Sequence, residues 1–367
     1  MRVLITGADG FIAKTLRVKL GECRDVEVLP YTRDADPATL PALLADADAV
    51  IHLAGLNQSA DADAFRIGNA EFTRLLARAL YMDGRALPVV MASAAQTHVQ
   101  TPYTRSKWEA EQVLKTYAAS MGAHVYIYRL PTVFGKWAPP DRHSAVATWC
   151  RDIAAGRQVN VDDPSTRLRL VYVDDVADEF IRVLRQRPTL DRPRVPVEYT
   201  STVGEVLDAL HAFHDSRATL TTPDVGTGLL RALHATYLSY LPPDEFSYRL
   251  PRHADARGAF VEVLKTRHAG QFSFFTAGPG VTRGGHYHHS KTEKFLVLRG
   301  HAQFRFRQIV SGLTHHLHTD GDTPEVVETV PGWTHDITNV GDHDLIVMLW
   351  ANEVFDRDRP DTIAAAL

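Results

Sequence analysis

The chain has 367 residues, a formal net charge of -4 and 45% hydrophobic residues. Because this length exceeds the size at which a single hydrophobic core stops growing, we expect two domains. The balanced charge gives no basic surface for nucleic acid, and the apolar runs are too short to cross a bilayer. Met1 leads directly into an apolar strand, so we expect a soluble cytoplasmic protein that binds neither nucleic acid nor membrane.

The first predicted elements are a short apolar strand over residues 2–6, a glycine-rich turn, and a helix to about residue 20. Gly7 and Gly10 allow a tight turn and the close approach of a pyrophosphate to the helix N-terminus, where unpaired amides favour anions. Ala13 holds the third position of the pattern, which needs only a small side chain for packing of the helix on the strand. This placement predicts a dinucleotide site.

A second strand, over residues 26–29, is followed by Arg33. An NAD-specific protein places an acid near the end of this strand to bind the ribose hydroxyls, whereas a guanidinium favours a 2'-phosphate. We therefore expect NADPH, with a solvated arginine as the alternative. Further strands are predicted over residues 49–53 and 88–92, with helical patterns between them. Alternating strands and helices predict a doubly wound parallel α/β sheet that binds ligands at the carboxyl ends of its strands.

Tyr103 and Lys107 lie four residues apart, after Pro102, at the head of a long helical pattern. Both side chains therefore share one helix face. A phenol is a poor proton donor at neutral pH, but a neighbouring ammonium lowers its pKa towards the working range. A solvated helix face gives the same spacing. Ser93 ends the preceding strand and is expected at the same edge of the sheet, which makes a hydride-transfer site the stronger interpretation.

Together these motifs resemble an extended short-chain dehydrogenase/reductase with a Rossmann-type fold, a class that acts on nucleotide sugars. The resemblance covers about the first 240 residues. The motifs that carry it are Thr6-Gly7-x-x-Gly10-x-x-Ala13, His52-Leu53-Ala54-Gly55, Asn69, Tyr103-x-x-x-Lys107, Arg129-Leu130-Pro131-x-x-Phe134-Gly135 and Val171-Tyr172-Val173-Asp174-Asp175-Val176-Ala177.

The resemblance implies that Tyr103 donates a proton and that Lys107 holds the ribose and lowers the phenol pKa. Cofactor contacts are implied for Gly7, Gly10, Phe11, Ile12, Arg33, Leu53, Ala54, Asn69, Tyr103 and Lys107. The class has a Ser or Thr after its fourth strand, but our alignment puts Ala94 there. We therefore expect Ser93 or Thr97 to take that catalytic role.

Two features follow this region. A loop over residues 136–144, broken by prolines, contains one tryptophan and three side chains that can be cationic. It either covers a uracil and pairs with a diphosphate or is an ordinary surface loop. The run Leu241-Pro242-Pro243-Asp244 predicts a boundary between a reductase domain, residues 1–243, and a second domain, residues 244–367.

Beyond the boundary, short runs over residues 258–264, 271–275 and 295–298 predict an antiparallel β-barrel or jelly roll. His286 and His288, two apart on a strand, point to one face, and Glu293 and His335 can complete a shell of three nitrogens and one oxygen. The spacing Gly280-x5-His286-x-His288-x4-Glu293-x6-Gly300, with Gly332-x2-His335-x3-Asn339, resembles a cupin. We expect Zn²⁺, with Fe²⁺ or another divalent metal possible, and His289 is an alternative ligand.

The pairing of a reductase with a metal-binding cupin resembles, over almost the whole chain, the bifunctional capsular-polysaccharide enzymes on the route to UDP-N-acetyl-L-fucosamine. This implies that the cupin epimerises carbon 3 of a UDP-2-acetamido-2,6-dideoxy-4-hexulose. The reductase then reduces carbon 4 with NADPH to an L-talose-type product. The closer likeness is carried by Tyr237-Leu238-Ser239-Tyr240-Leu241-Pro242, Phe246-Ser247-Tyr248, Glu293-Lys294-Phe295-Leu296-Val297, Arg305-Phe306-Arg307 and Asn352-Glu353-x-Phe355-Asp356.

Several points stay open at this level. Lys294 is the catalytic candidate for moving the proton at carbon 3, and His289 and Tyr287 are the alternatives. Exposed aromatic strands in the cupin favour a homodimer. Two other functions are compatible with the motifs, namely an iron dioxygenase cupin fused to a reductase, and an NADPH-binding sensor joined to a sugar-binding module.

Overall fold

The computed structural model describes residues 1–95, 101–142, 144–255, 258–261, 263–264, 266, 270–353, 356 and 358–367. The chain divides into two compact units, the first made of residues 1–144 and 168–200 and the second of residues 145–167 and 201–367. The expected functional boundary after residue 243 stays a prediction. Among the described residues, no helix has both the length and the apolar character that a bilayer span needs.

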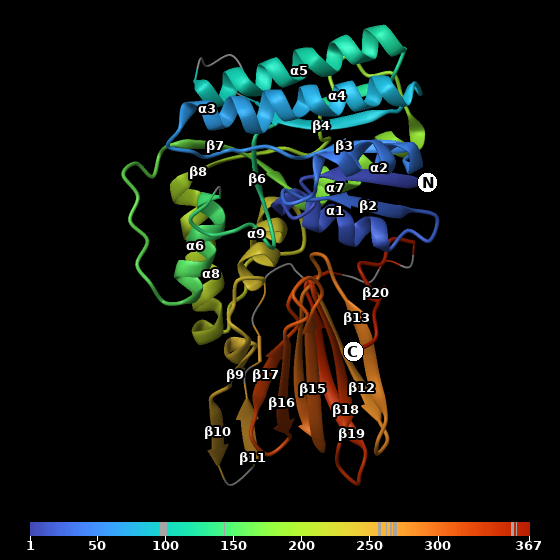
Figure 1. Ribbon diagram of the computed structural model, residues 1–367. Helices are drawn as coiled ribbons and strands as arrows, with labels where there is room; N and C mark the ends of the chain where they lie inside the picture. Colours follow the sequence, from blue (N-terminus) through green and yellow to red (C-terminus); the bar gives the residue numbers. More distant parts are fainter. Residues whose placement is uncertain are drawn as a thin grey trace. The chain divides into compact units, whose positions relative to one another are not determined.

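The first unit is built on a five-stranded parallel sheet in the order β2-β1-β3-β4-β5 (Figure 1). The strands are β1 (Arg2–Thr6), β2 (Glu27–Tyr31), β3 (Ala49–His52), β4 (Val89–Ala94) and β5 (Val125–Leu130). A smaller sheet has the order β6-β7-β8, with strands Thr132–Phe134, Arg167–Tyr172 and Tyr199–Thr202. The predicted doubly wound parallel sheet is confirmed.

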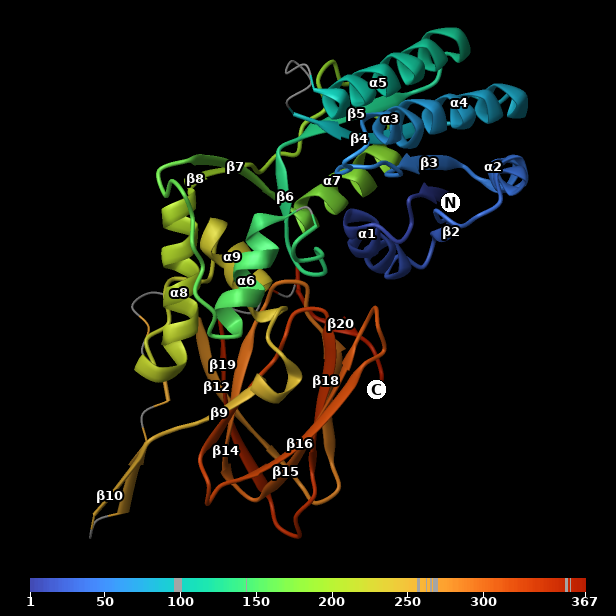
Figure 2. The ribbon, with the colours of Figure 1, turned by 60° about the vertical axis from the view of Figure 1, so that its left-hand side comes forward.

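Helices cover both faces of the large sheet because its strands are apolar on both sides. Val3 and Ile5 of β1 pack with α1 (Phe11–Gly21) and α7 (Val173–Gln186). Leu4, between them on the strand, packs on the other face with α2 (Leu40–Asp46), α4 (Phe72–Asp83) and α5 (Pro102–Met121). The two helical layers are visible on opposite sides of the sheet in Figures 1 and 2. Alternation along a buried strand thus produces two separate cores.

Two local features of the helices position the candidate site. Helix α5 begins at Pro102. The side chain of Thr101 accepts a hydrogen bond from the amide of Thr104, and the Thr104 hydroxyl accepts one from the amide of Thr101. This capping box and the proline at the first helical position start the helix as predicted. Between α3 (Ala62–Phe65) and α4, residues Arg66–Glu71 (η2) form a π-helical turn, a distortion that is frequent at functional sites.

The second unit contains helices α6 (Ala145–Ala154), α8 (Val203–Thr219) and α9 (Gly228–Leu238) and two five-stranded sheets, in the orders β12-β19-β14-β17-β9 and β16-β15-β18-β13-β20. These strands are β9 (Ser247–Arg249), β12 (Gln271–Ala277), β13 (Thr282–Tyr287), β14 (Glu293–Arg299), β15 (His301–Gln308), β16 (Thr314–Asp320), β17 (Glu325–Glu328), β18 (Trp333–Asn339), β19 (Leu345–Ala351) and β20 (Ile363–Ala364). The predicted all-β cupin architecture is confirmed.

Aromatic side chains fill the space within this β-structure. The ring of Phe295 from β14 packs edge to face against Phe304 from β15 at 5.8 Å, and Phe304 stacks on Phe306 at 6.5 Å. A separate hairpin joins β10 (Arg252–Asp255) to β11 (Gly258–Val261). Of the strand predicted over residues 258–264, the structure describes Gly258–Val261 as a strand.

Candidate functional site

The predicted dinucleotide turn lies at the carboxyl ends of β1 and β2. Gly7 has φ +70°, and the amides of Gly7 and Ala8 donate to the Tyr31 carbonyl at 2.9 and 3.2 Å. A Cβ at Gly7 would lie 2.7 Å from Cα of Ala54, so only glycine fits this approach. The turn therefore brings together the start of α1, which includes Phe11 and Ile12, and the segment Leu53–Ala54 after β3.

Arg33 is exposed two residues beyond β2, the strand whose Tyr31 carbonyl closes the glycine turn. Its position at the same sheet edge is compatible with binding a 2'-phosphate. The preference for NADPH stays a prediction.

Asn69 lies on the π-helical turn and ties the segment after β3 to α5. Its Oδ1 accepts from the amide of Leu56 at 2.7 Å, and its Nδ2 donates to the Leu56 carbonyl at 3.0 Å and to Ser106 Oγ at 2.9 Å. Since both amide hydrogens are used within the protein, Asn69 acts mainly on the placement of its neighbours. Its direct contact with a cofactor stays a prediction.

Gly55, in the segment after β3, lies close to the side chains of Asn69 and of Lys107 on α5. A Cβ on Gly55 would lie 2.7 Å from Oδ1 of Asn69 and 2.9 Å from Nζ of Lys107. Contacts this short do not occur at real Cβ atoms, so a larger residue would displace one of these two side chains. The glycine is therefore part of the predicted site.

Tyr103 and Lys107 occupy the first turns of α5 as the sequence predicts. Lys107 is buried, and its Nζ donates to the carbonyl of Ala92 on β4 at 3.4 Å. Burial lowers the pKa of Lys107 to about 8, while the negative charge of Glu111 opposes this lowering. Tyr103 packs edge-on against Phe65 at 5.7 Å.

The phenol of Tyr103 differs from expectation in its acidity. Burial raises the pKa of Tyr103, and this outweighs the lowering that the spacing of Tyr103 and Lys107 predicts. The group is therefore protonated at neutral pH, which is the form that can give a proton to a substrate oxygen.

Ser93, the proposed third catalytic residue, lies at the end of β4 and is buried. Its hydroxyl donates to Oε1 of Glu111 at 2.7 Å, and Glu111 also accepts from Arg129 at 3.0 and 2.6 Å. The geometry thus directs Ser93 towards α5, and its direct catalytic role stays a prediction. The alternative, Thr97, lies outside the described residues.

The loop after β6 contains a buried ion pair. Nζ of Lys136 lies 2.7 Å from both carboxylate oxygens of Asp174, the second residue of α7. The Lys136 side chain is fully buried. Lys136 therefore anchors the loop and is not an exposed cation for a diphosphate. The last cationic position predicted for this loop, His143, lies outside the described residues.

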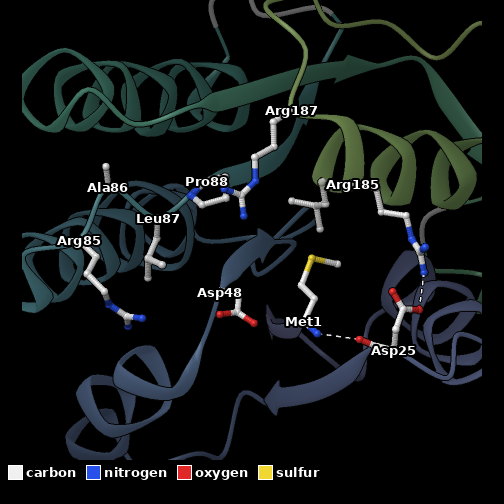
Figure 3. Close-up of a pocket in the computed structure, with 10 residues that line it drawn as sticks. Met1, Asp25, Asp48, Arg85, Ala86, Leu87, Pro88, Arg185 and Arg187 are labelled. Atoms are coloured by element: carbon white, nitrogen blue, oxygen red, sulfur yellow. Dashed lines mark hydrogen bonds and ion pairs between the residues drawn. The ribbon is translucent and has the colours of Figure 1, made fainter.

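A hollow of about 650 Å³ lies at the opposite edge of the sheet, near the N-terminal ends of β1, β3 and β4 (Figure 3). Two of the three arginines that line it are engaged by protein groups: Arg185 pairs with Asp25 at 2.8 Å, and Arg85 pairs with Asp83 at 2.8 Å and donates to carbonyls. Because ligands of such sheets bind at the carboxyl edge, this hollow is not the predicted site.

The four predicted metal ligands come together in the second unit. Each of His286, His288, Glu293 and His335 offers one donor atom, and these atoms all lie within 4.8 Å of one another. Nε2 of His288 lies 3.1 Å from Oε2 of Glu293, and Nε2 of His335 lies 3.7 Å from the same oxygen. Direct pairing of His286 on β13 with His335 on β18 brings the distant motifs side by side.

The chemistry of this donor set fits a divalent metal ion. Neither ring nitrogen of the buried His335 has a hydrogen-bond partner among the described residues. Burial, with the neighbouring imidazoles, lowers the pKa of His286 to about 4, and burial also lowers that of His335. Burial opposes ionisation of Glu293, but the rings of His288 and His335 that face its carboxylate hold its pKa well below the usual range. Neutral imidazoles and a carboxylate are the forms that bind metal.

Lys294, the expected proton carrier, is not brought to this cluster. It follows Glu293 on β14 and therefore points to the opposite face of the strand. Its ammonium pairs with Glu328 and donates to the hydroxyl of Tyr248 at 2.9 Å. The assignment of Lys294 as a proton carrier stays a prediction that this geometry does not favour.

Sequence reasoning missed Asp361. Its carboxylate accepts from the amides of His289, Ser290 and Lys291, at 2.7 Å each, immediately after the ligand His288. No spacing rule links Asp361 to the histidine motif, because Asp361 lies 70 or more residues further along the chain. His315, His316 and His318, which are not in the cluster, lie on β16.

Comparison with known proteins agrees with this two-part organisation. Residues 3–195 match the model of the NAD dependent epimerase/dehydratase family, and residues 253–363 match the polysaccharide biosynthesis C-terminal domain. The chain belongs to the NAD dependent epimerase/dehydratase family. The resemblance to reductases of this family joined to a second, polysaccharide-related domain is confirmed.

Two known proteins resemble the chain over its whole length. The UDP-2-acetamido-2,6-beta-L-arabino-hexul-4-ose reductase of Pseudomonas aeruginosa is 50% identical over 368 residues, which cover 100% of this chain and 99% of the relative. The crystal structure of the capsular polysaccharide assembling protein CapF from Staphylococcus aureus is 38% identical, with a TM-score of 0.69 and full coverage of both chains. A UDP-glucuronic acid 4-epimerase from Bacillus cereus shares the fold alone, with a TM-score of 0.52, 17% identity, and coverage of 60% of this chain and 83% of that one.

Proposed function

We propose that the chain is a bifunctional nucleotide-sugar enzyme of surface polysaccharide synthesis. It epimerises carbon 3 of a UDP-2-acetamido-2,6-dideoxy-4-hexulose and then reduces carbon 4 with NADPH to an L-talose-type product. The observation that carries this proposal is the presence, in one chain, of the Tyr103 and Lys107 pair on α5 and the three-histidine, one-carboxylate cluster. The name of the Pseudomonas aeruginosa relative supports the choice of substrate.

In the reductase half, the glycine turn and the N-terminus of α1 would hold the pyrophosphate of NADPH, and Arg33 its 2'-phosphate. The bound cofactor supplies hydride to carbon 4. Tyr103, protonated at neutral pH, gives its proton to the oxygen on that carbon as negative charge develops there. The Lys107 ammonium stabilises the resulting phenolate and hydrogen-bonds the ribose.

In the epimerase half, we propose Zn²⁺ as the ion held by His286, His288, Glu293 and His335. A bound divalent ion supplies Lewis acidity that stabilises the enediolate formed when the proton at carbon 3 leaves. The lowered pKa values of His286, His335 and Glu293 favour a neutral imidazole at each histidine and a charged carboxylate, which are the forms that bind the ion. Metal analysis should give one zinc per chain, and oxygen uptake with iron would contradict this assignment.

Proton transfer at carbon 3 needs a further side chain, and Lys294, His289 and Tyr287 are the candidates. The comparison is made with Lys294→Met, His289→Asn and Tyr287→Phe, each measured for exchange of the carbon 3 hydrogen with deuterium oxide. The carrier is the residue whose loss stops exchange while zinc content stays at one per chain. Loss of zinc together with exchange would identify a structural role instead.

The division of labour is tested with two matched variants. Tyr103→Phe should abolish NADPH oxidation and leave hydrogen exchange at carbon 3 intact. His335→Asn should abolish exchange and leave NADPH oxidation of an already epimerised substrate intact. Simultaneous loss of both activities in Tyr103→Phe, with zinc bound and the fold retained, would contradict the proposal.

We also propose that the protein is a homodimer. Phe272 and Phe274 lie on the edge strand β12 with 49% and 71% of their surface exposed. Apolar side chains on an open sheet edge promote pairing with another chain unless they are covered. Light scattering should give the mass of two chains, and Phe274→Ser should shift the mass towards one chain at low concentration.

A further inference from the structure

Asp361 makes a dense set of contacts beside the metal-ligand cluster. Oδ1 accepts from the amide of His289, and Oδ2 accepts from the amides of Ser290 and Lys291, all at 2.7 Å. Oδ2 also accepts from the Ser290 hydroxyl at 2.9 Å. One carboxylate thus satisfies three consecutive amides, which form an anion-binding concavity in the chain.

The backbone of Asp361 acts on a ligand directly. Nδ1 of His288 donates to the Asp361 carbonyl, while Nε2 of the same ring faces Glu293 at 3.1 Å. When one ring nitrogen carries the proton and donates it, the other has a free lone pair for a metal ion. The carbonyl therefore selects the tautomer of His288 that can bind metal through Nε2.

The loop held by the carboxylate connects two ligands. Only residues 289–292 separate His288 from Glu293, so the conformation of this loop sets the distance between the imidazole and the carboxylate. The loop has further anchors, among them the amide of Thr292, which donates to Oδ1 of Asn352 at 2.9 Å, and Nζ of Lys291, which donates to the Thr362 hydroxyl at 3.0 Å. Without Asp361, three amides beside the ligand would lose their acceptor.

The segment that carries Asp361 is itself fixed to the strands of the other ligands. Strand β20 pairs with β13 so that Ala364 lies opposite His286. The amide of Ala365 donates to the Gly285 carbonyl at 2.8 Å, and the Thr334 hydroxyl, next to His335, donates to the Ala365 carbonyl at 2.7 Å. Residues 361–365 therefore contact the strand positions of two histidine ligands and the loop after the third.

We propose that Asp361 is a positioning residue of the metal centre. Its carbonyl sets the tautomer of His288, and its carboxylate sets the loop that fixes the separation between His288 and Glu293. This inference rests on the metal site of the proposed function. It assigns to the C-terminal segment a role in metal affinity.

The test compares wild type, Asp361→Ala, Asp361→Asn and the control Asp358→Ala in the full chain. The affinity for Zn²⁺ is measured by competition with a chromogenic chelator, and the coordination geometry by the visible absorption of Co²⁺ in the site. Asp361→Ala should bind Zn²⁺ roughly 10- to 100-fold more weakly, the usual effect of losing a group that orients a ligand. It should also show a changed cobalt spectrum.

The other variants separate positioning from general damage. The backbone carbonyl is present in every variant, and Asp361→Asn also retains one side-chain oxygen that can accept from the loop amides, so it should recover part of the affinity. Asp358→Ala, on the same segment, should equal wild type, and NADPH oxidation of an epimerised substrate should be unchanged in every variant. If Asp361→Ala does not fold, the affinity and spectrum of Asp361→Asn decide the question.

Two failures are distinguishable. If wild type itself binds neither Zn²⁺ nor Co²⁺ at the cluster, the proposed metal site fails. If wild type binds the metal and the folded Asp361 variants bind it equally well with the same cobalt spectrum, the positioning role of Asp361 is overturned.

Discussion

The hydroxyl of Ser93 donates a hydrogen bond of 2.7 Å to the carboxylate of Glu111. Glu111 is fully buried on α5, about one turn beyond Lys107 and two turns beyond Tyr103. A buried carboxylate near a buried ammonium favours the charged form of the ammonium. Ser93 is thus linked, through Glu111, to the helix that carries the proposed catalytic pair of Tyr103 and Lys107.

Replacing Ser93 by Ala tests whether its hydroxyl acts on the substrate or only on Glu111. We expect the turnover rate of Ser93→Ala to stay within about threefold of wild type, since Arg129 still holds the Glu111 carboxylate through two hydrogen bonds. The measurement is steady-state NADPH oxidation with the keto sugar. If the turnover rate instead drops by roughly two orders of magnitude while KM is unchanged, the direct catalytic role predicted from the sequence is restored.

Reduction should depend on the charge of Lys107. Burial lowers the pKa of this group to about 8, so the ammonium predominates below that pH and is lost as the pH rises through it. We therefore expect kcat/KM for reduction to be constant below pH 8 and to fall about tenfold for each further pH unit. A profile that rises through pH 8 would contradict a requirement for the ammonium.

Glu111→Gln should move this fall in kcat/KM to lower pH, because the carboxylate opposes the lowering of the Lys107 pKa by burial. The expected loss at pH 8 is roughly 3- to 10-fold, with little change at pH 6. The matched control is Glu109→Gln on the same helix, whose carboxylate pairs with Arg74 and Arg105 instead. Its profile should overlay that of wild type.

Gly55→Ala should impair reduction without affecting the metal centre. The new Cβ would lie 2.7 Å from Oδ1 of Asn69 and 2.9 Å from Nζ of Lys107, so one of these groups must move. Misplacement of a catalytic group by about 1 Å can cost on the order of 100-fold in rate. Gly21→Ala, where a Cβ meets no atom within 4 Å, serves as the control. Equal turnover rates in the two variants would count against the predicted geometry.

The ion pair between Glu328 and Lys294 should stabilise the second unit in a pH-dependent way. Burial opposes ionisation of Glu328, but Arg217 and Lys294 lower its pKa to about 2, below the usual 4.5. Because the folded-state pKa is depressed, this stability is fully present above pH 4.5 and is lost as the pH falls towards 2.

Glu328→Gln removes the partner of two buried cations, so we expect it to reduce the free energy of unfolding by roughly 3–5 kcal/mol at pH 7. Urea denaturation measures the change. The control is Glu325→Gln on the same strand, whose carboxylate accepts from the Ser247 hydroxyl at 2.8 Å. If both variants unfold at the same urea concentration, the ion pair does not carry this stability.

The parts that sequence predicted correctly depend on short spacings. The glycine turn after β1 and the start of α5 at Pro102 follow from local rules of turns and caps. The spacing of His286 and His288 correctly predicted that their donor atoms meet, although β13 ends at Tyr287 and His288 lies one residue beyond it. That His335 lies beside His286, His288 and Glu293 was predicted from the resemblance to the cupin motifs alone. The rules for turns, caps and alternation act within a few residues, so they can be applied without knowledge of the tertiary structure.

The parts that were missed depend on long-range packing. Asp361 reaches the metal cluster from the far end of the chain, and the π-helical turn around Asn69 has no marker in the local sequence. The pKa of Tyr103 is dominated by burial, which spacing on a helix does not reveal. The orientation of Lys294 was within reach, because alternation along a strand already places it opposite Glu293.

Strand β14 has consecutive residues that serve different purposes: Glu293 faces the histidines, and Lys294 faces Glu328. Because each face of β14 has its own partners, the strand cannot shift its register. A shift by one residue would turn every side chain to the opposite face. An insertion or deletion between Glu293 and Leu296 would therefore remove the metal ligand and leave a buried acid without its counter-ion in the same event. We therefore expect β14 to accept some single substitutions but no change of length, because one such change would disturb both the proposed metal site and the packing of the strand.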